Sequence, residues 1–310
     1  MVTAESRKER HAVAVSILNY NSSEHTRTAV SSILGNTDPL LDFRIVVVEN
    51  GSQSTERVYP GEWSDARVQV VTSRINLGFA AGHQFALQFV RARYYFLFNN
   101  DGYFVNNVLR CLFDFMEAHP DVGLATGRCQ GPDGQPRPSF DYLPSLLRSV
   151  VGTGILRQIR PAFYPDRRAC YSEPLDVPMV TGSALFARGE LLESLGGLDT
   201  QFFLYCEEED LARRVRNVKQ RICYVPDAHF CHVGGGSMPM QLALRKEFYV
   251  SFLYYLRKHH GTFYVLGFRA FLLVRLLARV LRRRDAWSLW WFVVRGAPAY
   301  ESLRYHQRMV

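Results

Sequence analysis

Short apolar runs alternate with helical segments along the first 130 residues of the chain. Runs of five to seven mostly apolar residues have the length of buried strands, and they cover residues 12–18, 43–48, 68–72, 94–98 and 122–126. Helices are expected between them, at residues 24–34, in a segment that ends near residue 91, and at residues 105–119. Strands and helices that alternate at such short intervals predict an α/β fold with a mostly parallel sheet covered on both faces.

Polar side chains follow these strands at the points where they end. Asn19 and Asn21 follow the first strand, Glu49 and Asn50 the second, and the triplet 99–101 (Asn-Asn-Asp) the fourth. The carboxyl ends of parallel strands meet at one edge of a sheet, where open α/β folds bind their ligands, so we expect a common site there. A lone carboxylate at such an edge can hold Mg²⁺ or Mn²⁺ when substrate phosphates supply other ligands, although the triplet could also form a simple turn.

The second half of the chain is less regular. Eight of the 14 prolines lie between residues 132 and 178, which predicts long surface loops or a covering flap. Regular structure is expected again at residues 179–187, in a short helix after Gly189, and in a strand at residues 221–225. The segment after this strand contains His232 and the triple glycine 234–236, whose backbone amides could cradle phosphate oxygens or form a hinge.

Four successive carboxylates, from Glu207 to Asp210, open a helix that is expected to continue to about residue 218. Acidic residues at a helix N-terminus complement the helix dipole, which is a sufficient structural reason for their presence. The side chains of Glu207, Glu208 and Asp210 cannot all face solvent, however, so at least one is expected to point inward. Burial and like-charged neighbours would raise its pKa toward the range of a general base.

The C-terminal region combines apolar helices with arginines. Residues 263–281 are mostly apolar but include three arginines, and two more arginines follow directly. On a helix, these five side chains would lie within an arc of about 140°. They are Arg269, Arg275, Arg279, Arg282 and Arg283. Tryptophans at 287, 290 and 291 mark a second amphipathic segment. The pattern predicts helices that lie in a membrane interface with arginines toward anionic headgroups. Packing of the same helices on the core of the protein is the alternative.

The net charge of +8 belongs to this region. Residues 257–310 hold eleven of the 37 Lys and Arg residues and two of the 29 acidic ones, so residues 1–256 are close to neutral. Nucleic-acid binding, which needs a basic face on the folded domain, is therefore not expected. The six cysteines show neither a CxxC pair nor zinc spacing, and no signal peptide is recognisable, so reduced thiols in the cytoplasm are expected.

Together, the order and spacing of these motifs resemble those of the inverting family 2 glycosyltransferases with the GT-A fold. The resemblance covers residues 12–261 and is closest to the rhamnosyltransferase-like branch that builds bacterial surface polysaccharides. It rests on LNYN (18–21), VENGS (48–52), NLGFAAG (76–82), NND (99–101), TGS (181–183), EEEDL (207–211) and HVGGGS (232–237). A dehydrogenase is disfavoured because no GxGxxG follows a strand, and a nucleotidyltransferase because no basic glycine-rich loop follows the first strand.

The resemblance implies a role for each matching position. The nucleotide diphosphate of the donor would contact Asn19, Asn21, Glu49, Asn50, Asn76, Gly78, Gly82, Asn99 and Asn100. The donor sugar and the acceptor would lie near Gly182 and Ser183. A divalent metal ion, Mg²⁺ or Mn²⁺, would be held by Asp101 and His232. The catalytic base would be Glu208, with Glu207 and Asp210 as the other candidates.

Three positions depart from the family pattern. Glu49 replaces the usual Asp, Glu208 also replaces an Asp, and His83-Gln84 replaces the usual Asn-Asn pair. A longer carboxylate still accepts hydrogen bonds, so contact with the base remains expected at Glu49. The change at residues 83–84 alters the side chains expected beside the donor sugar.

The resemblance implies a metal-dependent enzyme of cell-surface glycan synthesis. It would transfer a sugar, with rhamnose from dTDP-rhamnose expected, from a dTDP- or UDP-linked donor to a lipid-linked or polysaccharide acceptor. Residues 1–240 would form the catalytic domain, with acceptor-side loops at 132–178, and residues 241–310 would attach it peripherally to the inner face of the cell membrane. A catalytically inactive protein that binds nucleotide sugars is the alternative, because the triplet 99–101 contains one acid instead of two.

Overall fold

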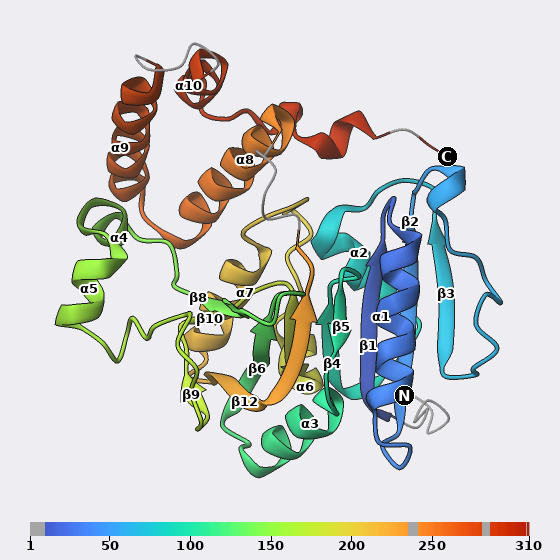
Figure 1. Ribbon diagram of the computed structural model, residues 1–310. Coiled ribbons are helices and arrows are strands. Elements are labelled where there is room, and N and C mark those ends of the chain that lie inside the picture. The colour runs from blue at the N-terminus through green and yellow to red at the C-terminus, as the bar shows by residue number, and fades with distance from the viewer. Residues whose placement is uncertain (1–9, 235–240, 281–285, 308, 310) are drawn as a thin grey trace, which may run out of the picture.

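The computed structural model describes residues 10–234, 241–280, 286–307 and 309, and its centre is a mixed sheet of ten strands (Figure 1). Eight strands follow the order β3-β2-β1-β4-β11-β6-β12-β5, while β7 pairs with β6 and β9 with β12. The strands of the first half are β1 (His11–Asn19), β2 (Phe43–Asn50), β3 (Val68–Ser73), β4 (Ala92–Phe98), β5 (Gly102–Phe104) and β6 (Val122–Gln130). The later ones are β7 (Pro136–Arg137), β9 (Leu175–Asp176), β11 (Ala184–Arg188) and β12 (Arg221–His232).

All five strands predicted from the apolar runs are present, as β1, β2, β3, β4 and β6. Strand β1 pairs in parallel with both β2 and β4, and β2 pairs in parallel with β3. The carboxyl ends of these four strands therefore share one edge, as predicted. The sheet becomes mixed beyond β4, because β11 runs antiparallel to both β4 and β6, and β5 runs antiparallel to β12.

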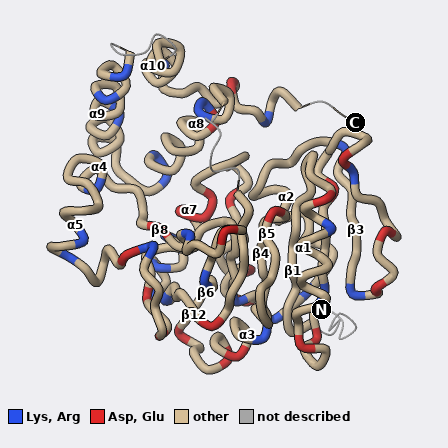
Figure 2. The backbone as a smooth tube through the Cα atoms, in the orientation of Figure 1, with Lys and Arg blue, Asp and Glu red and all other residues tan. Residues whose placement is uncertain are grey.

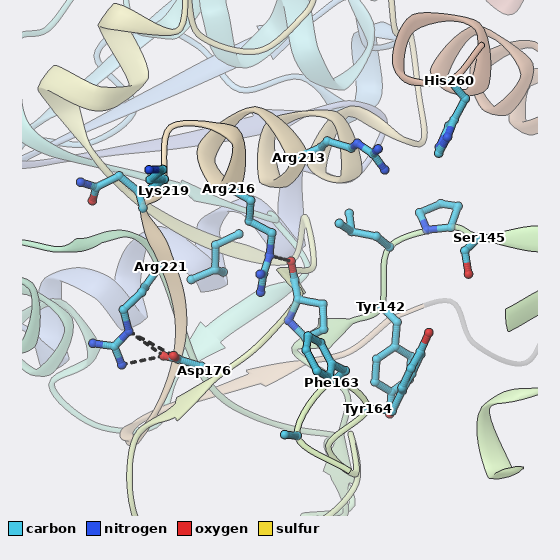
Figure 3. A pocket seen from close by; sticks show the side chains of 16 residues that line it. Tyr142, Ser145, Phe163, Tyr164, Asp176, Arg213, Arg216, Lys219, Arg221 and His260 are labelled. Carbon is cyan, nitrogen blue, oxygen red and sulfur yellow. Dashed lines mark hydrogen bonds and ion pairs between the residues drawn. The ribbon is translucent and has the colours of Figure 1, made fainter. Parts of the chain in front are cut away.

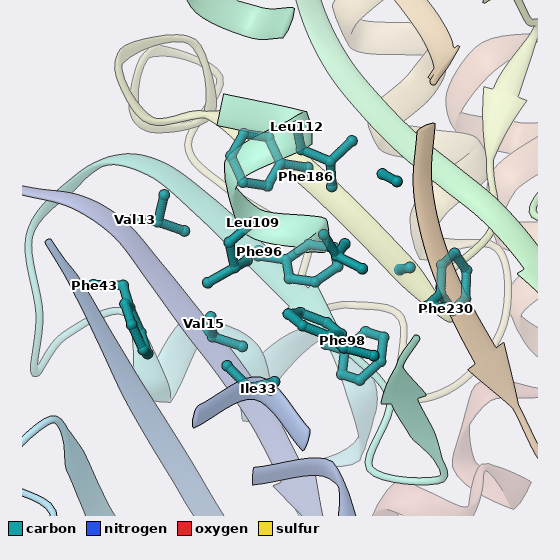
Figure 4. Packing of buried hydrophobic residues seen from close by; sticks show 14 of the residues in the cluster. Val13, Val15, Ile33, Phe43, Phe96, Phe98, Leu109, Leu112, Phe186 and Phe230 are labelled. Carbon is teal, nitrogen blue, oxygen red and sulfur yellow. The ribbon is translucent and has the colours of Figure 1, made fainter. Parts of the chain in front are cut away.

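Helices cover both faces of the sheet. On one face, α1 (Ser23–Asn36) and α3 (Val108–Ala118) pack through Ile33 and Leu112 against the aromatic side chains of β4 (Figure 4). On the other face lie α2 (Gly78–Ala86), α6 (Gly189–Ser194) and α7 (Glu207–Asn217). Leu192 of α6 and Leu211 of α7 pack with Leu97 of β4. Burial of each large apolar side chain contributes about 1.5–3 kcal/mol, so this double layer fixes the strand ends that form the site.

The proline-rich segment 132–178 holds only short elements. They are β7, β8 (Phe140–Asp141), α4 (Leu146–Val151), α5 (Thr153–Ile159) and β9. Outside this segment, a short 3₁₀ turn, η2 (Ser54–Glu56), follows β2. Strand β8 pairs with β10 (Met179–Val180) in a separate two-stranded sheet. The expectation of long loops in this segment is thus confirmed, and the small sheet ties the loops to the stretch before β11.

The C-terminal region forms α8 (Leu242–His259), α9 (Thr262–Val280) and α10 (Ala286–Val294), followed by the 3₁₀ turns η3 (Ala299–Glu301) and η4 (Leu303–His306). One face of α9, with Phe268 and Leu272, is buried against α8 and α10, so packing on the protein itself accounts for that face. Within the described part of the chain, no helix has both the length and the apolar character required to cross a membrane.

The opposite face of α9 remains exposed and apolar. Phe263 is 91% exposed and Val274 70%, and on a helix these side chains lie nearly opposite Leu272. Helix α9 contains three arginines and no acidic residue (Figure 2). Arg269 is bound to the neighbouring helix, because its guanidinium donates to the carbonyls of Val293 and Val294 at the end of α10. Arg282 and Arg283 of the predicted arginine arc lie outside the described residues.

Candidate functional site

A cavity of about 620 Å³ lies at the carboxyl ends of β1, β2 and β4, at the predicted edge of the sheet. We call it the donor cavity. The strands and the turns after them contribute Leu18, Tyr20, Asn50, Asn76, Phe98, Asn99, Asn100 and Asp101. Helix α2 contributes Gly78, Phe79 and His83, and the segment before α7 contributes Phe203 and Leu204.

The C-terminal region also lines the donor cavity, through Gln241, Ala243, Leu244, Leu303 and Gln307. The sequence did not predict this contribution. It follows from the fold, because Glu247 of α8 accepts hydrogen bonds from Ser302 and Leu303 and so fixes the final 3₁₀ turn beside the site. The one sequence signal for a polar partner of α8 was Glu247, the single acidic residue of a helix that also contains Arg245 and Lys246.

Asp101 and His232 form a pair at one wall of this cavity. The Nε2 atom of His232 lies 3.0 Å from Oδ1 of Asp101, and the Gly234 amide donates to Oδ2 at 3.2 Å. Pairing of β5 with β12 sets this geometry, because it places His232 opposite Gly102. Burial alone would raise the pKa of Asp101, but the hydrogen bond and charge of His232 and the Gly234 amide outweigh it and lower the pKa below its ordinary value.

The Asp101–His232 pair fits a divalent metal ion whose remaining ligands come from substrate phosphates. A carboxylate oxygen and an imidazole nitrogen converge within 3.0 Å, and about a quarter of each side chain is exposed. Both groups are ordinary ligands of Mn²⁺, and Mg²⁺ commonly takes one or two protein carboxylates plus phosphate oxygens. Among the described residues, no group of three or more His, Cys, Asp or Glu side chains could hold a metal ion without such help.

Asn99 and Asn100 hold the turn that presents Asp101. The Asn99 amide nitrogen of the backbone donates to the Ser183 carbonyl at 3.0 Å, which links the turn to the TGS motif. The Asn100 side chain donates to the hydroxyl oxygens of Ser22 at 2.5 Å and Thr26 at 3.0 Å. The triplet is therefore anchored from both sides, and both asparagines still line the donor cavity.

Asn19 and Glu49 lie behind the cavity wall rather than on it. The Asn19 side chain donates to the carboxylate of Glu49 at 2.7 Å and to the Glu56 carbonyl at 2.8 Å. Glu49 also accepts from the backbone amides of Ser52 at 2.7 Å and Val58 at 3.0 Å. Both side chains are fully buried, so in this structure they hold the loop after β2, and their contact with a nucleotide stays a prediction.

Asn21 stands at the exposed edge of the same loop. Its backbone has a φ of 53°, in the left-handed region that Asn tolerates better than most residues. Its side-chain oxygen accepts from the Gln53 amide at 2.8 Å, and its own amide donates to Ser52. The residue therefore joins the end of β1 to the loop after β2.

Asn50, Asn76 and Gly78 form a connected wall of the donor cavity. Asn50 donates to Asn76 at 3.1 Å and accepts from the Leu77 amide at 2.9 Å. Gly78 has a φ of +78°, and a β-carbon there would lie 2.1 Å from the Phe203 carbonyl oxygen, so only glycine fits. A β-carbon on Gly82 would meet the side chain of Leu18 at 2.9 Å, which explains how closely α2 approaches β1.

His83 is a buried neutral member of this wall. Its Nδ1 lies 2.7 Å from the Ser16 hydroxyl, and its ring packs edge-on against Phe79. Burial lowers the pKa of His83 to about 3, so the imidazole carries no charge at neutral pH. His83 therefore offers the cavity an uncharged ring, whereas Gln84 turns away to the Gly196 carbonyl.

Glu208 lies against the TGS motif. Its Oε1 accepts from the Gly182 amide at 3.3 Å, and a β-carbon on Gly182 would approach the same oxygen to 3.4 Å. Burial raises the pKa of Glu208, although its own amide and that of Gly182 oppose the shift. Ser183 lies within hydrogen-bond distance of Thr181, with 2.8 Å between the hydroxyl oxygens. Glu208, the predicted base, and Gly182, which is predicted to lie near the donor sugar and the acceptor, are thus in direct contact, and both roles stay predictions.

The other members of the acidic run differ sharply from Glu208. Glu207 is buried, its Oε2 has no hydrogen-bond partner among the described residues, and burial with the Glu208 charge raises its pKa well above the ordinary value. Asp210 is also buried but fully paired, with Arg214 Nε at 2.7 Å, Lys258 Nζ at 2.6 Å and His259 Nε2 at 2.7 Å. The prediction that at least one acid points inward is confirmed.

Part of the HVGGGS motif and the predicted domain boundary lie outside the described residues. His232 and Gly234 are described, but Gly235, Gly236 and Ser237 of the HVGGGS motif are not, and neither is residue 240, the predicted domain boundary. The predicted phosphate cradle of the triple glycine therefore remains a prediction.

A family profile described as "Glycosyl transferase family 2" matches residues 14–192, which is more than half of the chain. The chain is also 28% identical over 192 residues to N-acetylglucosaminyl-diphospho-decaprenol L-rhamnosyltransferase from two strains of Mycobacterium tuberculosis. The aligned part covers 56% of this chain and 61% of the relative, so the chain spans about three fifths of the length of the curated relatives it matches.

Two solved structures share the fold at low sequence identity. GalNAc-T7 with UDP, GalNAc and Mn²⁺ aligns over 78% of this chain and 47% of its own, with a TM-score of 0.55 and 13% identity. The mannosyltransferase PcManGT from Pyrobaculum calidifontis, in complex with GDP-Man and Mn²⁺, aligns over 81% and 64%, with a TM-score of 0.52 and 17% identity. The predicted GT-A fold is thereby confirmed, and the profile match shows that the chain belongs to glycosyl transferase family 2.

Proposed function

We propose that this glycosyltransferase moves a sugar, with inversion, from a nucleotide-diphosphate donor to a lipid-linked or polysaccharide acceptor. The observation that carries the proposal is that the Asp101–His232 pair and the Glu208–Gly182 contact both adjoin the donor cavity. Asp101 lines the cavity, and Gly182 lies against Phe79, another lining residue. The relative from M. tuberculosis is a rhamnosyltransferase that acts on a diphospho-decaprenol. Rhamnose from a dTDP-linked donor is therefore the donor that we propose to test first.

The donor diphosphate would occupy the cavity next to Asp101 and His232. Both fold neighbours contain Mn²⁺ together with a nucleotide or a nucleotide sugar, which supports a divalent ion at the equivalent edge. When bound there, Mg²⁺ or Mn²⁺ would offset the negative charge of the leaving diphosphate. Asn99 and Asn100 keep the turn in place while Asp101 faces the cavity.

Glu208 would act as the general base. The hydroxyl of the acceptor attacks the anomeric carbon, the bond from that carbon to the diphosphate oxygen breaks, and Glu208 takes the hydroxyl proton. This single displacement inverts the anomeric configuration and leaves the nucleoside diphosphate as the second product. Glu208 is the preferred candidate because Asp210 already binds three cationic or imidazole groups and Glu207 is buried away from solvent.

The exposed face of α9 and α10 would hold the enzyme on the cytoplasmic surface of the membrane. Phe263, Val274 and Trp287 are at least half exposed, and the nearby arginines suit anionic headgroups. Flotation with anionic liposomes tests this part: Phe263→Ser with Val274→Ser should reduce binding, and Leu40→Ser, a change at an exposed apolar residue far along the chain, should not.

The direct test of the enzymatic proposal is a panel of dTDP- and UDP-sugars. Release of nucleoside diphosphate is measured for the full chain with Mg²⁺ or Mn²⁺ and again after addition of EDTA. The proposal predicts release from one donor, dependence on the metal ion, and at least a 100-fold loss in Asp101→Ala. Equal release with and without EDTA would contradict the metal site.

The alternative is a protein that binds nucleotide sugars without turning them over. It is favoured by one observation only, the single acid in the triplet 99–101. Metal-dependent binding of a donor, measured by calorimetry, with no release from any member of the panel and no transfer to any acceptor would support it and overturn the enzymatic proposal.

A further inference from the structure

A second cavity, of about 600 Å³, lies beside α7 and shares no lining residue with the donor cavity. We call it the α7 pocket. Its walls are α7, the start of β12, the loop before α4 and the loop after α5 (Figure 3). Nothing in the proposed chemistry of Asp101 or Glu208 requires this pocket.

The α7 pocket is strongly basic. Arg213, Arg216, Lys219 and Arg221 line it, whereas Asp176 is the one acidic residue among the described residues in its wall. Asp176 is already paired with Arg221, at 2.6 Å between Oδ1 and Nη2. The guanidinium of Arg216 is fixed at the wall by hydrogen bonds to the carbonyls of residues 177 and 178. Arg221 also pairs with Asp121, so the charge that remains without an ion pair among the described residues is that of Arg213, Arg216 and Lys219.

His260 adds a polar atom that lacks a protein partner. Its Nε2 is buried and has no hydrogen-bond partner among the described residues, while its ring stacks on Tyr264 at a centroid distance of 4.1 Å. His260 and Arg213 point toward the same end of the pocket (Figure 3). A buried polar atom without a partner destabilises the folded protein, so a ligand atom that pairs with Nε2 would be bound more tightly.

The pocket is connected to the acceptor side of the reaction by α7 itself. Glu208 lies in the first turn of α7, and Arg213 follows five residues later, roughly 7.5 Å along the helix axis. Thr181, beside Gly182, donates its amide to the Ser139 carbonyl at 2.9 Å and so fixes the strand that leads to Tyr142 in the pocket wall. Five residues also turn Arg213 about 140° around the helix axis from Glu208, so the two side chains leave α7 in different directions, and an acceptor that reaches both must curve around the helix.

An exposed apolar surface begins at the rim of the pocket. Phe163 lines the pocket and is 68% exposed. Ser145, another lining residue, caps α4, whose Leu147 and Val150 are 53% and 64% exposed. A cationic pocket beside an apolar surface has the chemistry to bind an amphiphile with an anionic head, and arginine favours phosphate oxygens because its planar fork donates two hydrogen bonds.

We propose that the α7 pocket binds the diphosphate of a lipid-linked acceptor, through Arg213, Arg216 and His260, while the lipid chain leaves along Phe163 and α4. This inference rests on the proposed function for the statement that the ligand is an acceptor. The anion site itself does not depend on it.

Farnesyl diphosphate, which joins a diphosphate to an isoprenoid, is a suitable probe. Its binding to the full chain is measured by isothermal titration calorimetry with and without saturating dTDP. We expect binding in both conditions, and at least a tenfold loss of affinity in Arg213→Gln and in His260→Gln. Arg110→Gln, which changes an exposed arginine on α3 that is paired with Asp114, should bind as the unaltered protein does.

Two further ligands separate the contributions of head and tail. Inorganic pyrophosphate should bind more weakly than farnesyl diphosphate but with the same dependence on Arg213, whereas farnesol should show no dependence on Arg213. Thermal melting of each variant verifies that it is folded. Binding that saturating dTDP abolishes, or that folded Arg213→Gln and His260→Gln variants both retain in full, would overturn the proposal.

The failure of this inference can be distinguished from that of the proposed function. Release of nucleoside diphosphate in the absence of acceptor should require Asp101 and be unaffected by Arg213→Gln, whereas the acceptor KM of Arg213→Gln should rise at least tenfold without a matching fall in kcat. Farnesyl diphosphate binding in a protein that uses no donor would overturn the proposed function and leave the anion site standing.

Discussion

Substitution of Asp210 tests whether this member of the acidic run 207–210 stabilises the fold, as its ion pairs indicate, rather than taking part in the reaction. Its carboxylate is fully buried and accepts from Arg214 Nε at 2.7 Å, with Lys258 at 2.6 Å and His259 at 2.7 Å. Asp210→Asn keeps the volume of the side chain but removes its charge, which leaves the largely buried Arg214 without a counter-charge, whereas the more exposed Lys258 keeps Asp199 as a partner. Loss of one partner from a buried ion pair costs about 3–5 kcal/mol.

The chain offers a matched control at Asp114. It accepts from Arg110 Nε, also at 2.7 Å and also four residues away on a helix, but its side chain is 53% exposed. An exposed pair of this kind contributes about 0.2–1 kcal/mol, so Asp114→Asn should have a small effect. The two pairs share their distance and their four-residue spacing, although the acid precedes the arginine in one and follows it in the other. Because that order changes a helix pair by only a few tenths of a kcal/mol, the difference between the variants reports mainly the burial and the additional partners of Asp210.

Urea unfolding of both variants measures this difference. With an m-value of about 3 kcal/mol per molar urea, a loss of about 3 kcal/mol lowers the midpoint by about 1 M for Asp210→Asn, against a few tenths for Asp114→Asn. At a temperature where it is folded, Asp210→Asn should retain its transfer rate within a few-fold. Equal destabilisation by the two changes would refute the structural role, and a folded but inactive Asp210→Asn would refute the assignment of Glu208 as the base.

Three further outcomes follow from the site. Burial and the Glu208 charge raise the pKa of Glu207, so the folded state loses stability as pH rises from the pKa of the unfolded chain through that of the folded one. The melting temperature of Glu207→Gln should therefore rise relative to that of the unaltered protein as pH increases from 4 to 8. A difference in melting temperature that stays constant over this range would contradict the prediction. Because the pKa of Glu208 is raised and the base must be ionised, the transfer rate should increase with pH across a midpoint above the ordinary glutamate value, and a rate that falls over that range would exclude Glu208. Gly78→Ala should weaken dTDP binding at least tenfold, because its β-carbon would meet the Phe203 carbonyl at 2.1 Å, whereas Gly154→Ala, with no atom within 4 Å, should bind as before.

The sequence was sufficient for the parallel half of the sheet but not for the antiparallel strands. Apolar runs bounded by turns identify β1, β2 and β4 because each is buried on both faces. The edge strand β3 is only partly buried, and its β-branched run of Val68, Val70 and Val71 identifies it. The direction of β11 cannot be deduced from periodicity, and β5 has only three residues. Pro226 predicts the end of a strand, yet β12 continues to His232, because a register shift between Val225 and His229 accommodates the proline as a bulge.

The site was predictable in position but not in every contact. Motif order identifies the sheet edge and the meeting of Asp101 with His232, whereas the contact of Gly182 with Glu208 comes from the structure. It cannot decide whether a polar residue after a strand faces a ligand or holds its own loop, and Glu49 does the latter in this structure through Ser52 and Val58. The helices after residue 241 were ambiguous for a similar reason, since α9 is apolar on both its buried and its exposed face.

The central claim is that Asp101 holds the donor diphosphate whereas Glu208 accepts the proton, and one comparison tests it directly. Metal-dependent dTDP binding and the transfer rate are measured side by side for Glu208→Gln and Asp101→Asn. We predict that Glu208→Gln binds dTDP normally and loses transfer by about 10²–10⁴-fold, and that Asp101→Asn loses both. Transfer by Glu208→Gln at close to the unaltered rate, or metal-dependent dTDP binding that survives in Asp101→Asn, would contradict the account.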